Sequence, residues 1–195
     1  MTPIVYLIRH GQTDWNAEGR LQGQADTDIN ALGRSQADGN GRRLRDLIAE
    51  PGAFDFVASP LRRTRETMER VRRSMGLPAE GYRTDARLKE VHFGDWQGST
   101  FAELEAREPG STAARTANKW TFCPPGDDAE SYVDLTERVR PVFEEFSGPV
   151  VCVTHGGILR VAFRLFGGLS DTDASALEIP QDRVLAIRHG VPSWL

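Results

Sequence analysis

The amino-terminal stretch constrains this chain more than any other, because an apolar run turns abruptly into a polar loop. Residues 3–8 read Pro-Ile-Val-Tyr-Leu-Ile, a β-branched and aromatic run of strand length. Arg9-His10-Gly11 follows directly and offers a cation, a titratable nitrogen and a permissive backbone. Ligands of open α/β sheets bind beyond the carboxyl ends of strands. The pattern therefore predicts a site at Arg9 and His10 that suits phosphate.

The same order of features returns late in the chain. Residues 149–154 include Val-Val-Cys-Val, which predicts a buried strand of the parallel type, and His155-Gly156-Gly157 leads from it into an apolar helix at 158–166. A second Arg-His-Gly, Arg188-His189-Gly190, follows a last predicted strand at 183–187. The tripeptide alone does not show which of its two copies is functional.

Helical and extended patterns alternate between these ends. We expect an α/β fold in three layers, a mostly parallel sheet with helices on both faces. The segment 11–29 is expected to be a long irregular loop, and such loops in compact domains are usually functional or disordered. The other predicted elements are helices at 31–49, 60–75, 100–107 and 131–146, a strand at 54–58 and an extended segment at 82–90.

The length of 195 residues predicts one domain, residues 1–195, with an inserted lid or rim at about 92–128. The net charge of −4 gives no reason to expect nucleic acid or an anionic membrane as the main partner. No leader and no apolar run of about 18 residues is found, so we expect no membrane span. The sequence leaves a homodimer open.

Cysteine and histidine spacing bears on compartment and metal use. Cys123 and Cys152 lie far apart with no CxxC pair, which favours a reduced, cytoplasmic setting. The four histidines never occur at metal-ligand spacing. We therefore expect a site without a metal.

Charged side chains follow four predicted extended segments. Arg9-His10, Arg62-Arg63, Glu90 and His155 each lie at or just past a carboxyl end, and these ends meet at one edge of a layered α/β sheet. Together these residue types can transfer a phosphoryl group. A histidine offers a nitrogen nucleophile, the arginines offer cations for the phosphoryl oxygens, and the carboxyl group offers an acid for the leaving oxygen.

With these motifs the chain resembles the histidine phosphatase superfamily, which also contains the cofactor-dependent phosphoglycerate mutases. The matching blocks stand in the family's order and span nearly the whole chain. They are Leu7-Ile8-Arg9-His10-Gly11-Gln12-Thr13, Trp15-Asn16, Gly19-Arg20-Leu21-Gln22-Gly23, Ser59-Pro60-Leu61-Arg62-Arg63-Thr64, Leu88-Lys89-Glu90, Phe93-Gly94-Asp95-Trp96-Gln97-Gly98 and Val153-Thr154-His155-Gly156-Gly157. Only the first Arg-His-Gly is followed by Gln-Thr and Trp-Asn, so we expect no catalytic role for His189.

The resemblance implies a phosphoglycerate mutase-like fold and a role for each matched residue. His10 would attack phosphorus and become a phosphohistidine, Arg9, Arg63 and His155 would hold the phosphoryl oxygens, and Glu90 would donate the proton. The positions implied to line the phosphate pocket are Arg9, Asn16, Gln22, Gly23, Arg63, His155 and Gly156. The attacking ring must present an unprotonated nitrogen, so a backbone carbonyl should fix the other one. No cofactor is implied.

Departures from the mutases favour hydrolysis. Phe93 stands where the mutases have Tyr, residues 99–101 offer no Lys, and Arg107 and Arg115 are not adjacent. We therefore expect a metal-independent phosphomonoesterase of small metabolites, a histidine acid-type phosphatase. A phosphoglycerate mutase, a protein phosphohistidine phosphatase and a phosphate-binding module without turnover remain alternatives. An apolar wall from four aromatics could receive the leaving group: Trp96, Phe101, Trp120 and Phe122.

Overall fold

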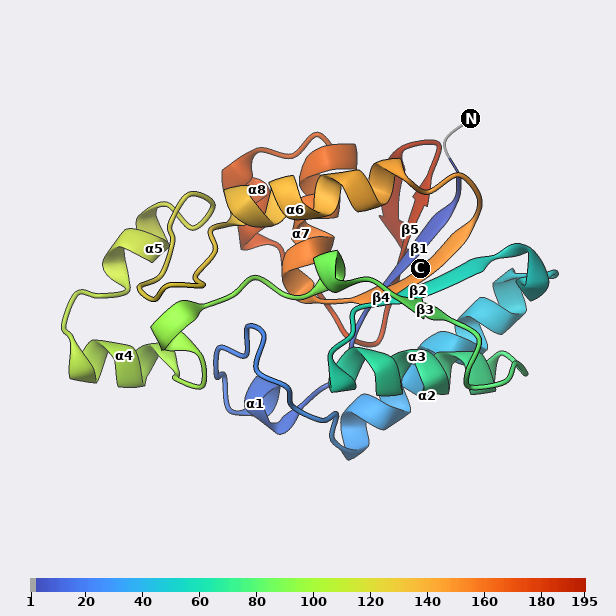
Figure 1. Ribbon diagram of the computed structural model, residues 1–195, viewed down its shortest axis with the longest axis horizontal. Coiled ribbons are helices and arrows are strands. Elements are labelled where there is room, and N and C mark those ends of the chain that lie inside the picture. The colour runs from blue at the N-terminus through green and yellow to red at the C-terminus, as the bar shows by residue number, and fades with distance from the viewer. Residues whose placement is uncertain (1–2) are drawn as a thin grey trace.

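A six-stranded mixed sheet lies at the centre of the computed structural model, which describes residues 3–195 (Figure 1). The strand order is β3-β2-β4-β1-β5-β6. β1 (Val5–Arg9), β2 (Asp55–Ala58), β3 (Arg83–Thr84) and β4 (Val150–Thr154) run parallel. β5 (Val184–Arg188) pairs antiparallel with β1, and β6 (Val191–Trp194) pairs antiparallel with β5. The predicted α/β fold with a mostly parallel sheet is confirmed.

Helices cover both faces of the sheet, which gives the three expected layers. α2 (Ala31–Leu47) and α3 (Arg62–Ser74) cover one face, and α6 (Tyr132–Glu144), α7 (Gly156–Phe166) and α8 (Asp171–Ala176) cover the other (Figure 1). Alternate residues of β1 serve the two layers: Leu7 packs in the cluster of α6 and α7, and Ile8 packs in the cluster of α3. This alternation follows from the strand period of two.

Several short helices were not predicted from the sequence. The loop expected at 11–29 contains α1 (Asp14–Ala17), and the lid or rim expected at about 92–128 contains α5 (Ala113–Ala117), close to α4 (Phe101–Arg107) (Figure 1). Single-turn 3₁₀ helices occur at Pro51–Ala53, Ala86–Leu88 and Gly94–Trp96. Helices of one turn carry too little hydrophobic periodicity to be predicted. None of the helices within residues 3–195 has the length and apolar character needed to cross a membrane.

The start of α3 differs from the expectation. The sequence predicts a helix at 60–75, with Pro60 in its first turn and Ser59 before it as a residue type that can cap a helix. In the structure α3 begins at Arg62, and its N-cap Leu61 makes no side-chain capping bond. The Ser59 hydroxyl instead lies 2.8 Å from Nε2 of His155. Ser59 therefore contacts His155 at the end of the neighbouring strand β4 and does not cap α3.

The second Arg-His-Gly forms the turn of a hairpin between β5 and β6. His189 and Gly190 both have positive φ angles, 52° and 76°, which two-residue hairpin turns require. Because β5 runs antiparallel to β1 and pairs Ile187 with Val5, its end lies at the edge of the sheet opposite His10. His189 is therefore remote from the strand ends that carry the other motif residues.

The loop that follows β1 is pressed against the first turn of α2. A methyl group on Gly33 would lie 2.2 Å from the carbonyl oxygen of Gln12, and one on Gly11 would lie 2.2 Å from the carbonyl oxygen of Gly33. The amide of Gln12 also donates to Oε1 of Gln36 at 2.9 Å. Close backbone approach, which only glycine permits, thus fixes the loop that carries His10.

Two alanine substitutions in α2 test this packing. Gly33→Ala is expected to lower the free energy of unfolding by at least about 1 kcal/mol, because the methyl group overlaps backbone atoms that must move apart. Gly39→Ala is the control: its methyl group meets only the end of Arg42, at 3.8 Å, so it is expected to raise stability by about 0.5–1 kcal/mol through helix propensity. Urea unfolding measures both. Equal effects of the two variants would contradict the close-packing account.

Candidate active site

The residues predicted for the site meet beyond the carboxyl ends of β1 and β4. They surround a cavity of about 270 Å³. The predicted residues that line it are Arg9, His10, Asn16, Gln22, Gly23, Arg63, Glu90 and Gly156. His155 is fully buried behind them, with its ring centroid 5.2 Å from that of His10. The structure therefore brings all nine predicted positions together.

His10 presents a neutral imidazole. Its Nδ1 lies 2.8 Å from the carbonyl oxygen of Gly11, so the neutral ring donates from Nδ1 and leaves Nε2 unprotonated. Burial lowers the pKa of His10 well below its ordinary value, and the charges of Arg63 and Arg9 lower it further. Burial and the same arginines also lower the pKa of His155. An unprotonated Nε2 is the form that can attack phosphorus.

Three nitrogens at this site are buried without a hydrogen-bond partner in residues 3–195: Nε of Arg9, Nε of Arg63 and Nδ1 of His155. In both arginines, terminal guanidinium nitrogens already donate hydrogen bonds to backbone carbonyls. Arg63 donates from its two terminal nitrogens to the carbonyls of Ala25 and Gly23, at 2.6 and 2.7 Å. Nη1 of Arg9 donates to the carbonyl of Ile179 at 2.7 Å. Most buried polar groups in proteins are paired, so three unpaired nitrogen donors at one site indicate a place for an oxyanion.

Burial changes the acidity of the two guanidinium groups without removing their charge. Loss of solvation lowers the pKa of Arg9 and that of Arg63 to about 10, and the charge of Glu90 partly opposes this. Both groups stay cationic at neutral pH. A phosphate entering the cavity would thus meet two desolvated cations, whose attraction water screens less than at a surface.

Asn16 and Gln181 form a small amide network beside His10. Nε2 of Gln181 donates to the carbonyl of His10 and to Oδ1 of Asn16, both at 3.0 Å. Oδ1 of Asn16 also accepts from the amide and the hydroxyl of Thr13. Its Nδ2 is the group left to donate toward the cavity. Sequence reasoning missed Gln181, because no motif surrounds it and only the fold brings it to His10.

Glu90 is held at the amino terminus of α7. The amide of Gly157 donates to both of its carboxylate oxygens at 3.1 Å. A methyl group on Gly157 would lie 2.2 Å from Oε1, so only glycine leaves room for this contact. Arg138 fixes the backbone before it by donating to the carbonyls of Lys89 and Glu90 at 2.9 and 3.2 Å. The carboxyl group is thus positioned at the cavity wall from two sides.

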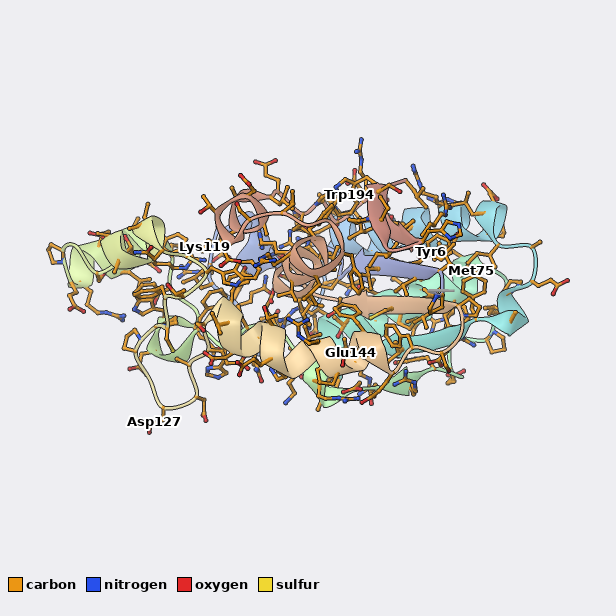
Figure 2. The ribbon with its side chains drawn as sticks, turned by 90° about the horizontal axis from the view of Figure 1, so that it is seen from above. Tyr6, Met75, Lys119, Asp127, Glu144 and Trp194 are labelled. Carbon is orange, nitrogen blue, oxygen red and sulfur yellow. The ribbon has the colours of Figure 1, made fainter. Side chains whose placement is uncertain are left out.

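The rest of the cavity wall was not predicted as site residues. The further lining residues are Arg20, Leu21, Phe93, Phe101, Arg115, Lys119, Tyr132 and Arg160. Figure 2 shows Lys119 where the projecting segment of α4 and α5 meets the body of the molecule. Of the four aromatics considered for an apolar wall, only Phe101 lines the cavity. Trp96 packs against Phe122 and Trp120 against Tyr132, with ring centroids 5.1 Å apart in each pair.

A comparison with protein families matches residues 5–194 to the histidine phosphatase superfamily, branch 1. The chain belongs to this superfamily. It is 37% identical to glucosyl-3-phosphoglycerate phosphatase of Mycobacterium tuberculosis, over 78% of this chain and 70% of that protein. It is 33% identical to metal-independent phosphoserine phosphatase of Arabidopsis thaliana, over 84% and 68%. The expected family and enzyme class, a phosphoric monoester hydrolase, are confirmed.

Solved structures agree with this family assignment. The structure of the mycobacterial glucosyl-3-phosphoglycerate phosphatase in complex with VO3 superimposes with a TM-score of 0.80 and 32% identity, covering 99% of this chain and 96% of that one. The phosphoglycerate mutase-like fold expected from the motifs is therefore present. In this histidine phosphatase, no group of three or more His, Cys, Asp or Glu among residues 3–195 is arranged to hold a metal ion.

The electrostatics of His10 can be tested directly. We expect the ring to titrate well below pH 6.5 in the free enzyme, because burial and two arginines disfavour the imidazolium form. Below that pKa the ring is protonated, and above it Nε2 is free. A ¹⁵N NMR titration of the histidines, with His10→Asn for assignment, gives the pKa and the tautomer. Titration at or above pH 6.5, or a proton on Nε2, would contradict this electrostatic account.

Proposed function

We propose that this protein is a metal-independent phosphomonoesterase that hydrolyses small-metabolite phosphates through a phosphohistidine on His10. The observation that carries the proposal is the set of three unpaired nitrogens, on Arg9, Arg63 and His155, around an imidazole with an unprotonated Nε2. Phosphoryl transfer is catalysed mainly by positioning and by charge stabilisation. This site offers both.

The first half-reaction forms the phosphoenzyme. Nε2 of His10 attacks phosphorus in line with the ester oxygen, and a P–N bond forms as the P–O bond breaks. Nε of Arg9, Nε of Arg63 and Nδ1 of His155 donate to the phosphoryl oxygens. Glu90, which lines the cavity, gives its proton to the departing alkoxide as the general acid of this step.

The second half-reaction releases phosphate. After the alcohol leaves, the carboxylate of Glu90 takes a proton from water, which attacks phosphorus as the P–N bond breaks. His10 recovers its neutral ring, and its Nδ1–H remains bound to the carbonyl of Gly11. Residues 92–128 form the rim that limits access to the cavity, and the place of Phe93, Phe101, Arg115 and Lys119 in its wall supports this part of the proposal.

Trapping of the intermediate tests the nucleophile. Wild-type protein mixed with a ³²P-labelled phosphomonoester in EDTA is expected to yield an acid-labile, base-stable phosphoprotein, and His10→Ala is expected to yield none and to lose turnover. His189→Ala, in the hairpin turn, is the matched histidine control and is expected to label normally. Label on His10→Ala, or turnover that EDTA abolishes, would reject the mechanism. Label that passes to an alcohol and not to water would indicate a mutase.

The role of Glu90 is tested by varying the leaving group. Glu90→Gln is expected to lower kcat/KM for alkyl phosphates by about 10²-fold or more, because an alkoxide needs a proton to leave and kcat/KM reports formation of the phosphoenzyme and not the later attack of water. The loss for p-nitrophenyl phosphate is expected to be much smaller, because p-nitrophenolate is a stable anion. Steady-state kinetics on both substrates measure the difference. Equal losses on the two substrates would assign Glu90 a structural role.

A further inference from the structure

Three cations that the sequence did not predict as site residues line the cavity, and none is paired with an acidic side chain. Arg115 lies on α5, Lys119 follows it, and Arg160 lies on α7. Within residues 3–195, none of the three forms an ion pair with a carboxylate, whereas Arg20 on the same wall is paired with both Glu18 and Glu103. The cavity wall thus carries positive charge that the protein leaves uncompensated.

The positive charges of these three side chains repel one another, which destabilises their charged forms. Burial, together with the charges of Arg160 and Arg115, lowers the pKa of Lys119 to about 7, while the charge of Glu90 opposes the shift. Burial and Arg160 also lower the pKa of Arg115. Like charges in a partly desolvated wall repel, and an anion between them would relieve that repulsion.

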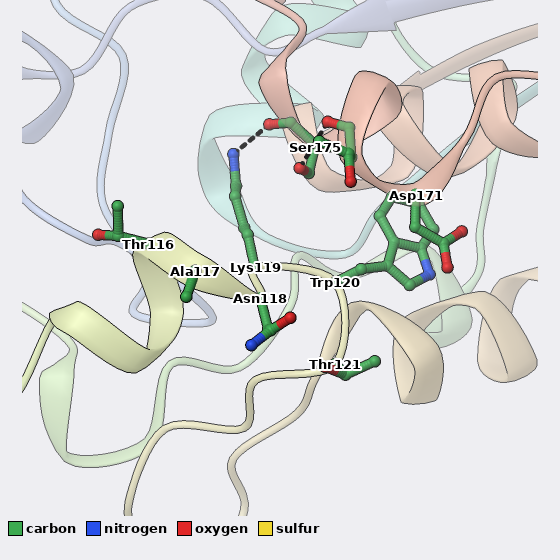
Figure 3. A pocket seen from close by; sticks show the side chains of 9 residues that line it. Thr116, Ala117, Asn118, Lys119, Trp120, Thr121, Asp171 and Ser175 are labelled. Atoms are coloured by element: carbon green, nitrogen blue, oxygen red, sulfur yellow. Dashed lines mark hydrogen bonds between the residues drawn. The ribbon is translucent and has the colours of Figure 1, made fainter.

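Uncharged groups hold the three side chains in place before any ligand arrives. Arg160 donates from Nε to the carbonyl of Leu177 at 3.1 Å. Nζ of Lys119 donates to the carbonyl of Ser175 on α8 (Figure 3). The guanidinium of Arg115 lies over the ring of Phe101, 4.9 Å from its centroid. Preorganised donors of this kind bind a ligand with a smaller loss of side-chain entropy.

The group also stands next to the phosphoryl site. A methyl group on Gly156 would lie 3.4 Å from Nη1 of Arg160 and 3.5 Å from Nε of Arg9. Arg160 is therefore a neighbour of a nitrogen assigned above to the phosphoryl oxygens, and Lys119 and Arg115 line the same cavity. A cavity of about 270 Å³ leaves room for a small alcohol between the two charged regions.

We propose that Arg115, Lys119 and Arg160 form a second anion subsite, which binds an oxyanion carried by the leaving alcohol of the substrate. The inference rests on the proposed function, because it assigns the phosphoryl group to His10 and the alcohol to this wall. The preferred substrates are then phosphomonoesters whose alcohol bears a carboxylate or a second phosphate. Both are oxyanions that guanidinium and ammonium groups bind by charge-assisted hydrogen bonds.

Three probes on one three-carbon skeleton test the subsite. Glycerol 3-phosphate has no second anion, 3-phosphoglycerate adds a carboxylate, and glycerol 1,3-bisphosphate adds a phosphate. We expect kcat/KM for at least one anionic probe to exceed that for glycerol 3-phosphate by about tenfold or more, the ratio that one charge-assisted hydrogen bond supplies. The preferred probe shows which oxyanion the subsite takes.

Variants then assign the preference to these side chains. Lys119→Met and Arg160→Met are each expected to reduce the ratio between the anionic and the neutral probe by about tenfold. Lys119→Arg, which keeps the charge, is expected to retain most of it. The matched control is Arg107→Met, which removes an exposed cation from α4 that does not line the cavity. General damage to the fold would lower turnover of all three probes alike and leave the ratio unchanged.

The two proposals fail in different ways. A wild-type enzyme that forms the phosphoenzyme and hydrolyses all three probes equally would reject the subsite and leave the proposed function intact. A preference that Lys119→Met and Arg160→Met both retain would also reject the subsite. Absence of any phosphoenzyme would reject the proposed function itself.

Discussion

The site depends on two guanidinium groups that are kept beside two neutral imidazoles at the ends of β1 and β4. Burying charge is costly unless polar groups surround it. Arg63 and Arg9 donate to backbone carbonyls with their terminal nitrogens, yet each retains one buried nitrogen without a partner. Burial, and after it the charges of these arginines, lowers the pKa of His10 and of His155 well below the ordinary value and keeps both rings neutral. The fold thus maintains a desolvated positive pocket beside an uncharged imidazole, an arrangement that favours an incoming phosphate.

The rest of the structure serves to hold this arrangement. Parallel pairing of β1 with β4 sets Arg9 opposite Thr154 and so brings His10 next to His155. Close packing of Gly11 on Gly33 fixes the loop after β1 against α2. The fork of Arg63 anchors residues 23–25 at the cavity wall. Strand pairing, close packing of the loop on α2 and hydrogen bonds to the backbone thus together position His10, His155 and Arg63.

The family resemblance supplied Asn16, Gln22, Gly23 and Gly156, whereas strand-end patterns were enough to predict the fold class and to bring Arg9, His10, Arg63, Glu90 and His155 to one edge of the sheet. They succeed because parallel strands end at one edge, so a residue just past a strand has a foreseeable place. Gln181, Lys119 and Arg160 could not be found in this way. Gln181 has no surrounding motif. Arg160 lies in an apolar helical segment, and the helical pattern does not predict which residues from other elements lie beside it. Ser59 shows that local sequence can also mislead. The Ser-Pro pair is typical of a helix start, but in the structure the Ser59 hydroxyl contacts the ring of His155.

A crystal structure with orthovanadate tests the central claim most directly, because vanadate adopts the geometry of phosphorus under attack. The account predicts vanadium within bonding distance of Nε2 of His10, with its oxygens accepting from Nε of Arg9, Nε of Arg63 and Nδ1 of His155. Vanadate bound away from His10, or bound there with these three nitrogens still unpaired, would contradict it.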